Sequence, residues 1–331
     1  MFSSAMHLQE EWAMVKDYTL SSTKSYHTGG LKSLGWELTI CNALQQEGTP
    51  LRKLLTCNES FGRLLYDCLC TFLPLWNVTH VLEVGGGYGY LMKDFLEKDS
   101  SLKACMLDIS PFLLNKQRET LKEFSVEYRE GDFLEVLPSD LSAFDLVIMN
   151  ENLGDFPSLI NIRTEVFDSK IANNDPVLKW VQGIFEKYGL ERPEGKVFNL
   201  NMGAIEALEK LCCAKVPYIY IGEHSCEASV SGEMSSLFQI KSTGNPERIT
   251  LAGHDEYTIK FSYLQKIASF HGYESMRGPF ADFIPLTLTD EARFALMYGG
   301  HYSDEAEVMS QFVEDLYKYE YLILKEKEEP I

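Results

Sequence analysis

A glycine-rich turn between a predicted strand and a predicted helix is the part of this sequence best suited to hold a ligand. The stretch Val81–Met92 reads VLEVGGGYGYLM, an apolar run followed by glycines at alternate positions and a helix-like start. Gly85, Gly87 and Gly89 let the backbone turn sharply and leave main-chain atoms unshielded by a Cβ. The start of the next helix offers backbone N–H groups that lack intrahelical partners. Such a turn is typical of a site for a nucleotide-like cofactor.

Two cofactor classes use turns of this kind. A dinucleotide site has the order G-x-G-x-x-G, which lets the helix approach a pyrophosphate closely. Here the third glycine comes one residue earlier, and Glu83 precedes the turn. A carboxylate there would repel a phosphate but suits a cation, such as the amino group of a methionine moiety. The arrangement resembles motif I of the class I S-adenosylmethionine (SAM) methyltransferases, and a purely structural turn is the alternative.

Acidic residues follow the next predicted strands. The stretch Lys103–Asp108 predicts a second strand that ends in an acid, where a doubly wound sheet presents a carboxylate to ribose hydroxyls. A third strand over Ser125–Arg129 is followed by Asp132 and Phe133, which resemble the acid and the apolar neighbour that meet the adenine of SAM in methyltransferases. Singly, either acid is also compatible with a helix cap or a turn.

A fourth strand, predicted over Phe144–Glu151, ends in polar residues and completes the pattern. The strand order and the strand-end acids predict a Rossmann-like, doubly wound α/β sheet that binds SAM. The predicted cofactor-binding residues are Glu83, Gly85, Gly87, Gly89, Asp108, Ile109, Asp132, Phe133 and Asn150.

Composition limits the class of protein. The chain has 331 residues, of which 45% are hydrophobic, so a full core in one large or two modest domains is expected. The formal net charge of −19 disfavours nucleic acid and anionic membranes as partners. No run approaches a membrane span, and the N-terminus has neither a basic, apolar signal sequence nor an Arg-rich transit sequence. We therefore expect a cytoplasmic protein without a nucleic-acid or membrane partner.

The eight cysteines show no C-x-x-C pair, and no histidines cluster with them at metal-ligand spacing. Reduced thiols and no metal site are expected.

Three parts are expected along the chain. Residues 1–78 should form an N-terminal helical cap, residues 79–225 the SAM-binding core, and residues 226–331 the rest of the sheet and cap. Further elements predicted from periodicity are helices over 61–73, 176–188, 203–213, 262–271, 290–298 and 305–324, a fifth strand over 217–222, and a hairpin over 273–284.

The later part of the chain resembles a specific family. The block Glu194–Leu200, a predicted helix and then Tyr218–Ile221 are similar to the E-V-N … L-L-I-D-Y-G region of the MidA-like methyltransferases. Asn150–Pro157 is similar to the family's N-E-x-x-D-A-x-P, and Thr56–Gly62 to its T-x-P-E-I-S-x-x-F-G. The chain departs from the family pattern where D-Y-G is replaced by Gly-Glu-His at 222–224. The family includes a mitochondrial complex I assembly factor that methylates a protein arginine, so the resemblance implies SAM as cofactor and an arginine as one candidate acceptor.

Methyl transfer from a sulfonium needs alignment, desolvation and sometimes a base. Glu151 and Asp155 follow the fourth strand, at the edge where doubly wound sheets bind ligands, and could orient a nucleophile and accept its proton. Alternatively, Glu151 binds backbone N–H groups and Asp155 caps a turn. His224, after the fifth strand, is a second candidate base.

The sequence thus predicts a SAM-dependent methyltransferase that acts on a nitrogen or oxygen nucleophile. Two other functions are compatible with it: a small-molecule N- or O-methyltransferase of a biosynthetic pathway, and a non-catalytic assembly factor that keeps the SAM fold. The identity of the acceptor and the presence of a homodimer stay open.

Overall fold

The computed structural model describes residues 18–31, 39–49, 51–168, 175–298 and 303–327. Its centre is a seven-stranded sheet with the order β11-β12-β8-β5-β2-β3-β4. The strands are β2 (His80–Val84), β3 (Lys103–Asp108), β4 (Val126–Glu130), β5 (Leu146–Asn150), β8 (Tyr218–His224), β11 (Tyr273–Pro279) and β12 (Tyr319–Glu326). The five strands from β8 to β4 are parallel, whereas β12 is antiparallel to both β8 and β11. This topology confirms the predicted doubly wound sheet.

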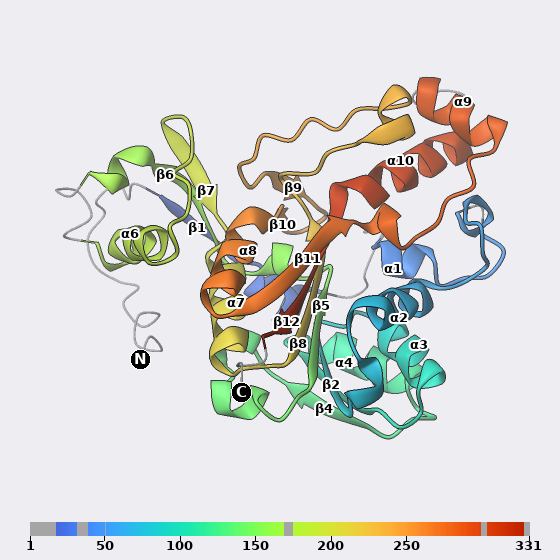
Figure 1. The fold of residues 1–331 in the computed structure, drawn as a ribbon, viewed down its shortest axis with the longest axis horizontal. Helices are drawn as coiled ribbons and strands as arrows, with labels where there is room; N and C mark the ends of the chain where they lie inside the picture. Colours follow the sequence, from blue (N-terminus) through green and yellow to red (C-terminus); the bar gives the residue numbers. More distant parts are fainter. Residues whose placement is uncertain (1–17, 32–38, 50, 169–174, 299–302, 328–331) are drawn as a thin grey trace.

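Helices cover both faces of the sheet (Figure 1). Along β5, Val147 and Met149 belong to one hydrophobic core, and Leu146 and Ile148 belong to the other. This alternation follows from the two-residue period of a strand, and it explains why the central strands read as continuous apolar runs. The helices are α1 (Ile40–Ala43), α2 (Phe61–Phe72), α3 (Tyr90–Lys98), α4 (Pro111–Thr120), α5 (Pro138–Leu141), α6 (Pro176–Tyr188), α7 (Met202–Cys213), α8 (Phe261–Phe270), α9 (Asp290–Tyr298) and α10 (Asp304–Lys318).

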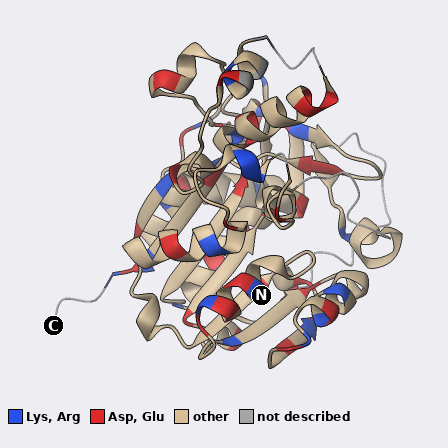
Figure 2. Cartoon of the chain, turned by 90° about the vertical axis from the view of Figure 1, so that its right-hand side faces the viewer, with Lys and Arg blue, Asp and Glu red and all other residues tan. Residues whose placement is uncertain are grey.

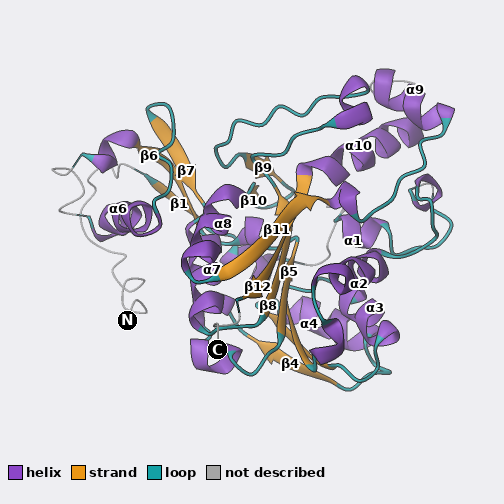
Figure 3. Cartoon of the chain, viewed as in Figure 1, coloured by secondary structure: helices purple, strands orange, loops and turns teal. Residues whose placement is uncertain are grey.

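The two cores draw on different helices. Helices α6, α7 and α8 contribute to the core that contains Val147, and α2, α3 and α10 contribute to the core that contains Ile148. Figure 3 shows the helices arranged around the sheet, and Figure 2 shows that basic and acidic residues are interspersed along the outer helices and loops.

Two small sheets lie beside the central one. Strand β6 (Ser158–Arg163) pairs with β1 (Thr19–Ser21) and with β7 (Val197–Leu200), and β9 (Arg248–Thr250) pairs with β10 (Asp255–Tyr257). The pairing of β1 with β6 ties the N-terminal segment to the chain that follows β5. Neither β1 nor β6 was predicted from the sequence.

Most predicted elements are confirmed, and two are wrong. The stretch 273–284 is not a hairpin, because β11 pairs with β12 and ends in a short 3-10 turn. The last helix ends at Lys318, and Tyr319–Glu326 forms β12 inside the sheet. A short apolar run buried on both faces has no distinctive period, so periodicity alone does not separate a strand from a helix there.

None of the helices in the described ranges is long and apolar enough to cross a membrane. All eight cysteines lie in the described ranges and are free.

Candidate functional site

The glycine turn joins β2 to α3 at the carboxyl edge of the parallel strands. Gly85, Gly87 and Gly89 have positive φ angles of 61°, 54° and 82°, which only glycine adopts without strain. A Cβ at Gly85 would lie 2.8 Å from Nδ2 of Asn152, whose amide donates to the carbonyl of Val84. The turn therefore needs glycine both for its backbone conformation and for the side chain packed against it.

Glu83 lies beneath this turn. Its side chain is buried, and a Cβ at Gly86 would lie 2.8 Å from its carboxyl carbon. Burial raises the pKa of Glu83 to about 8, the charge on Asp108 adds to the rise, and the backbone N–H of Met92 opposes it. The Oε2 atom has no hydrogen-bond partner within the described ranges. A buried acceptor of this kind suits a cationic donor that the protein itself does not supply.

Asp108 ends β3 beside the turn. One carboxylate oxygen accepts a hydrogen bond from the Ser110 backbone N–H at 2.8 Å, and the other from Nε2 of Gln117 at 2.9 Å. Gln117 also donates to the carbonyl of Gly87, so it links the acid to the turn. Burial raises the pKa of Asp108 to about 6 against these bonds. Each carboxylate oxygen can accept more than one hydrogen bond, so Asp108 can still receive a hydroxyl.

Asp132 follows β4, and Asn150 is the last residue of β5. Asp132 caps a short 3-10 turn through the Leu134 N–H and makes a 2.8 Å ion pair with Lys24 of the N-terminal segment. The Asn150 side chain donates to Oε1 of Glu151 and accepts from the Tyr220 hydroxyl.

Phe133 and Ile109, the two apolar residues among the predicted cofactor-binding residues, differ in burial. Phe133 is buried in a core, with its ring centroid 6.3 Å from that of Phe156, so it is mainly a packing residue here. Ile109 directly follows Asp108 and is partly exposed.

Glu151 binds backbone N–H groups rather than facing solvent. Its carboxylate accepts from the N–H of Ile40 at 2.7 Å and of Cys41 at 3.2 Å, at the start of α1. Burial raises the pKa of Glu151 to about 7, and these bonds oppose the rise. The geometry matches the alternative in which this carboxylate positions the backbone.

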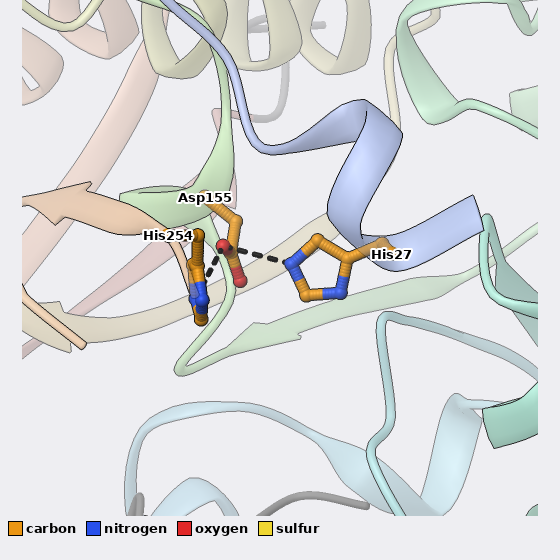
Figure 4. A group of neighbouring side chains, drawn as sticks. All are labelled: His27, Asp155 and His254. Atoms are coloured by element: carbon orange, nitrogen blue, oxygen red, sulfur yellow. Dashed lines mark ion pairs between the residues drawn. The ribbon is translucent and has the colours of Figure 1, made fainter. Parts of the chain in front are cut away.

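Asp155 ends the 3-10 turn Leu153–Asp155 after β5 and meets two histidines (Figure 4). Its Oδ1 lies 2.9 Å from Nε2 of His27 and 3.5 Å from Nε2 of His254. His27 belongs to the π-helical turn Tyr26–Gly30, and His254 precedes β10. Figure 4 shows the two rings on either side of the carboxylate. Sequence reasoning missed both histidines, because about a hundred positions or more separate the three residues from one to the next and no local spacing marks them.

His224 is not part of this cluster in the described contacts. Its ring packs edge-on against Tyr319, with 4.9 Å between centroids, and burial lowers its pKa to about 4. The preceding residue, Glu223, instead contacts the turn after β5, because its carboxylate accepts from the Gly154 N–H at 3.1 Å. Burial raises the pKa of Glu223 to about 8, and the nearby charge of Glu256 contributes. An acid after the fifth strand was the sequence signal that could have identified Glu223.

The acidic side chains thus gather where β5 and β8 end. Glu256 connects to the histidine cluster, since its Oε1 lies 3.1 Å from Nε2 of His254. This edge combines carboxylates and imidazoles, which can orient a polar nucleophile and receive a proton.

The sequence and the fold were compared with those of known proteins. Residues 81–168 match a family model described as a methyltransferase domain. No curated protein sequence matches the chain. An uncharacterized protein from Burkholderia thailandensis has a similar structure, with a TM-score of 0.52 and 13% identity over 91% of this chain and 84% of that one. This likeness supports the fold.

Two further solved structures align with lower scores. Magnesium protoporphyrin IX methyltransferase from Synechocystis PCC 6803, with bound SAM, has a TM-score of 0.45 and 11% identity over 96% of this chain and all (100%) of that one. A Haemonchus contortus phosphoethanolamine N-methyltransferase in complex with S-adenosylhomocysteine has a TM-score of 0.43 and 12% identity over 81% of this chain and 53% of that one. The match over residues 81–168, on the doubly wound sheet described above, identifies a methyltransferase domain in this part of the chain.

Proposed function

We propose that this SAM-dependent methyltransferase transfers the methyl group to a nitrogen or oxygen nucleophile that binds beside Asp155 and Glu256. The observation that carries the proposal is the shared edge: the glycine turn, Glu83 and Asp108 lie at the ends of β2 and β3, and Asp155 follows the neighbouring β5. Ligands of open α/β sheets bind outside the carboxyl ends of the strands. Cofactor and acceptor can therefore meet at this edge.

The residues present fit the cofactor. The unpartnered oxygen of Glu83 suits the amino group of the methionine moiety, and Asp108 suits the ribose hydroxyls. Asp132 is the proposed partner of the adenine amine, in competition with Lys24. Bound SAM supplies a methyl group on a positively charged sulfur, which is already activated toward a nucleophile. The protein then needs to align the acceptor and remove its proton.

Asp155 and Glu256 are the proposed acceptor-side residues. Their side chains remain 19% and 24% exposed, whereas Glu151 and Glu223 are bonded to backbone N–H groups. A carboxylate with some access can orient a nucleophile and take its proton. In this proposal Glu151 positions α1, and His224 has no assigned proton transfer.

The resemblance to MidA-like methyltransferases supports a protein arginine as the first acceptor to test. A small molecule is the second class of acceptor to test, because residues of the chain itself cover this edge of the sheet. Lys24 and His27 of the N-terminal segment contact Asp132 and Asp155, so the chain's own residues lie across both strand ends. A small molecule needs less open surface than a protein substrate does.

Calorimetric titration of SAM and S-adenosylhomocysteine into wild type, Asp108→Asn and Glu130→Gln tests the cofactor assignment. Micromolar binding should be weakened at least tenfold by Asp108→Asn, because a good hydrogen bond to a charged group contributes roughly 1.5–3 kcal/mol. The exposed control Glu130→Gln, at the end of β4, should bind as wild type does. Transfer of labelled methyl from SAM to arginine peptides and to small amines and alcohols then identifies the acceptor. Absence of binding to wild type would contradict the proposed function.

A further inference from the structure

We propose that His27, Asp155 and His254 form a binding site for one divalent metal ion of the zinc type. The three side chains each offer one ligand atom, and these atoms all lie within 4.8 Å of one another. Two imidazole nitrogens and one carboxylate oxygen are a common donor set for zinc in proteins. The proposal rests on these three side chains and goes beyond the proposed methyl transfer. With the ion bound, Asp155 is a metal ligand, and Glu256 is the carboxylate left to take the acceptor's proton.

The spacing of the donors fits a small tetrahedral ion. Zinc binds nitrogen and oxygen ligands at about 2.0–2.2 Å, so neighbouring ligand atoms in a tetrahedral site are roughly 3.3–3.5 Å apart. Here Oδ1 of Asp155 is 2.9 Å from Nε2 of His27 and 3.5 Å from Nε2 of His254. Both distances are close to the spacing that a tetrahedral ion requires.

His27 and Asp155 meet in a close, buried contact. Both Nε2 of His27 and Oδ1 of Asp155 are buried, and neither has a hydrogen-bond partner within the described ranges, although only 2.9 Å separates them. Buried polar atoms normally find partners. A cation between them would bind both atoms at once.

The surroundings hold the ligands in place. Tyr26 stacks on the His254 ring, with 4.2 Å between centroids and 20° between planes. The Thr23 hydroxyl donates to the backbone carbonyl of Asp155 at 2.8 Å, which fixes the turn relative to the N-terminal segment. The His254 side chain is 4% exposed and that of His27 13%. Ligands immobilised in this way lose little entropy when a metal binds.

Three protein ligands leave one tetrahedral position for water or a substrate atom, as in catalytic zinc sites. Glu256 adjoins the site, because its Oε1 lies 3.1 Å from Nε2 of His254, a contact that must open when this nitrogen binds the metal. The sequence analysis expected no metal site, since the donors come from three distant segments. The metal would also join these segments, namely the N-terminal turn, the turn after β5 and the loop between β9 and β10 (Figure 4).

Metal analysis of the full chain tests the proposal. The apo protein is prepared with a chelator and titrated with Zn²⁺, and with Co²⁺ to record visible absorption. We expect about one ion per chain and an intense cobalt spectrum of the tetrahedral kind. His27→Asn and His254→Asn should each weaken Zn²⁺ binding by roughly a hundredfold or more, since loss even of an outer-shell partner costs 10–100-fold. His80→Asn, at the start of β2, is the matched control and should bind as wild type does.

Circular dichroism and binding of S-adenosylhomocysteine establish that each variant is folded. If wild type binds no stoichiometric Zn²⁺ or Co²⁺, or if both histidine variants keep the wild-type affinity, the metal site is refuted. If a variant fails to fold, Asp155→Asn replaces it, and unchanged metal affinity in that folded variant also refutes the site. If wild type binds S-adenosylhomocysteine but no metal ion, only the metal site is overturned. If wild type binds the metal ion but no S-adenosylhomocysteine, only the proposed function is overturned.

Discussion

The substitution Glu83→Gln should make the protein's stability less sensitive to pH. Burial beneath the glycine turn raises the pKa of Glu83 from 4.5 to about 8, and the charge of Asp108 contributes to the rise. In the unfolded chain this carboxyl titrates at its ordinary value. Between pH 4.5 and about 8 the folded protein therefore holds a proton that the unfolded chain has released. The free energy of unfolding must fall as the pH rises through this window.

The size of the effect follows from the two pKa values. Within the window each pH unit removes up to about 1.4 kcal/mol from the free energy of unfolding. Between pH 5 and pH 7 the ionisation of Glu83 should remove about 2.5 kcal/mol. Glutamine cannot ionise, and its carbonyl can still accept from the Met92 N–H. The variant should therefore gain about 2–3 kcal/mol relative to wild type over these two pH units.

Urea unfolding at pH 5, 6, 7 and 8 measures this difference. Glu123→Gln is the control, because Glu123 is an exposed glutamate in the loop after α4. The wild-type and Glu123→Gln curves should fall in parallel, while Glu83→Gln diverges upward from both. If all three proteins show the same pH dependence, Glu83 does not hold a proton in the folded chain over this pH range, and the reasoning from its burial is refuted.

Three further outcomes test other parts of the site. Gly85→Ala should lower the free energy of unfolding by about 1–3 kcal/mol and weaken S-adenosylhomocysteine binding, because Gly85 has a positive φ and the Asn152 amide lies close to it. Urea unfolding and calorimetry measure the two effects. The control Gly131→Ala should be tolerated, because its new Cβ would meet its nearest atom at 3.9 Å. Glu151→Ala should cost about 2–4 kcal/mol in unfolding experiments, because two backbone N–H groups of α1 lose their acceptor. Lys24→Met should change stability by less than about 1 kcal/mol and raise affinity for S-adenosylhomocysteine up to about fivefold, by freeing Asp132; a loss of affinity would contradict this competition.

Local sequence signals predicted the central sheet and several helix ends. The strand β3 begins and ends at the predicted residues, because a short apolar run terminates in an acid and a Ser-Pro helix start. Helix α6 follows the Asp175 cap and stops at Gly189, which has the left-handed conformation. Both features depend on neighbouring residues alone, so a single sequence contains the necessary information.

The parts that sequence reasoning missed depend on contacts between distant segments. The stretch Tyr319–Glu326 becomes a strand because it pairs on one side with β8 and on the other with β11, and both of these strands precede it in the sequence. Glu151 was a candidate base, with backbone binding as the alternative, and the partners that it has are backbone N–H groups of α1, about 110 positions away. No spacing rule within one sequence relates residues that only the fold brings together.

The N-terminal segment links the two halves of the proposed site. Lys24 pairs with Asp132 at the end of β4, and His27 pairs with Asp155 after β5. The strands β3 and β2 lie between β4 and β5 in the sheet, and they carry Asp108 and the glycine turn. One short segment therefore contacts both sides of the proposed cofactor position. A change in residues 18–31 should alter cofactor binding and the acceptor side together, whereas a change in Asp108 should alter the cofactor alone. Comparing these two kinds of variant separates a shared positioning effect from a direct one.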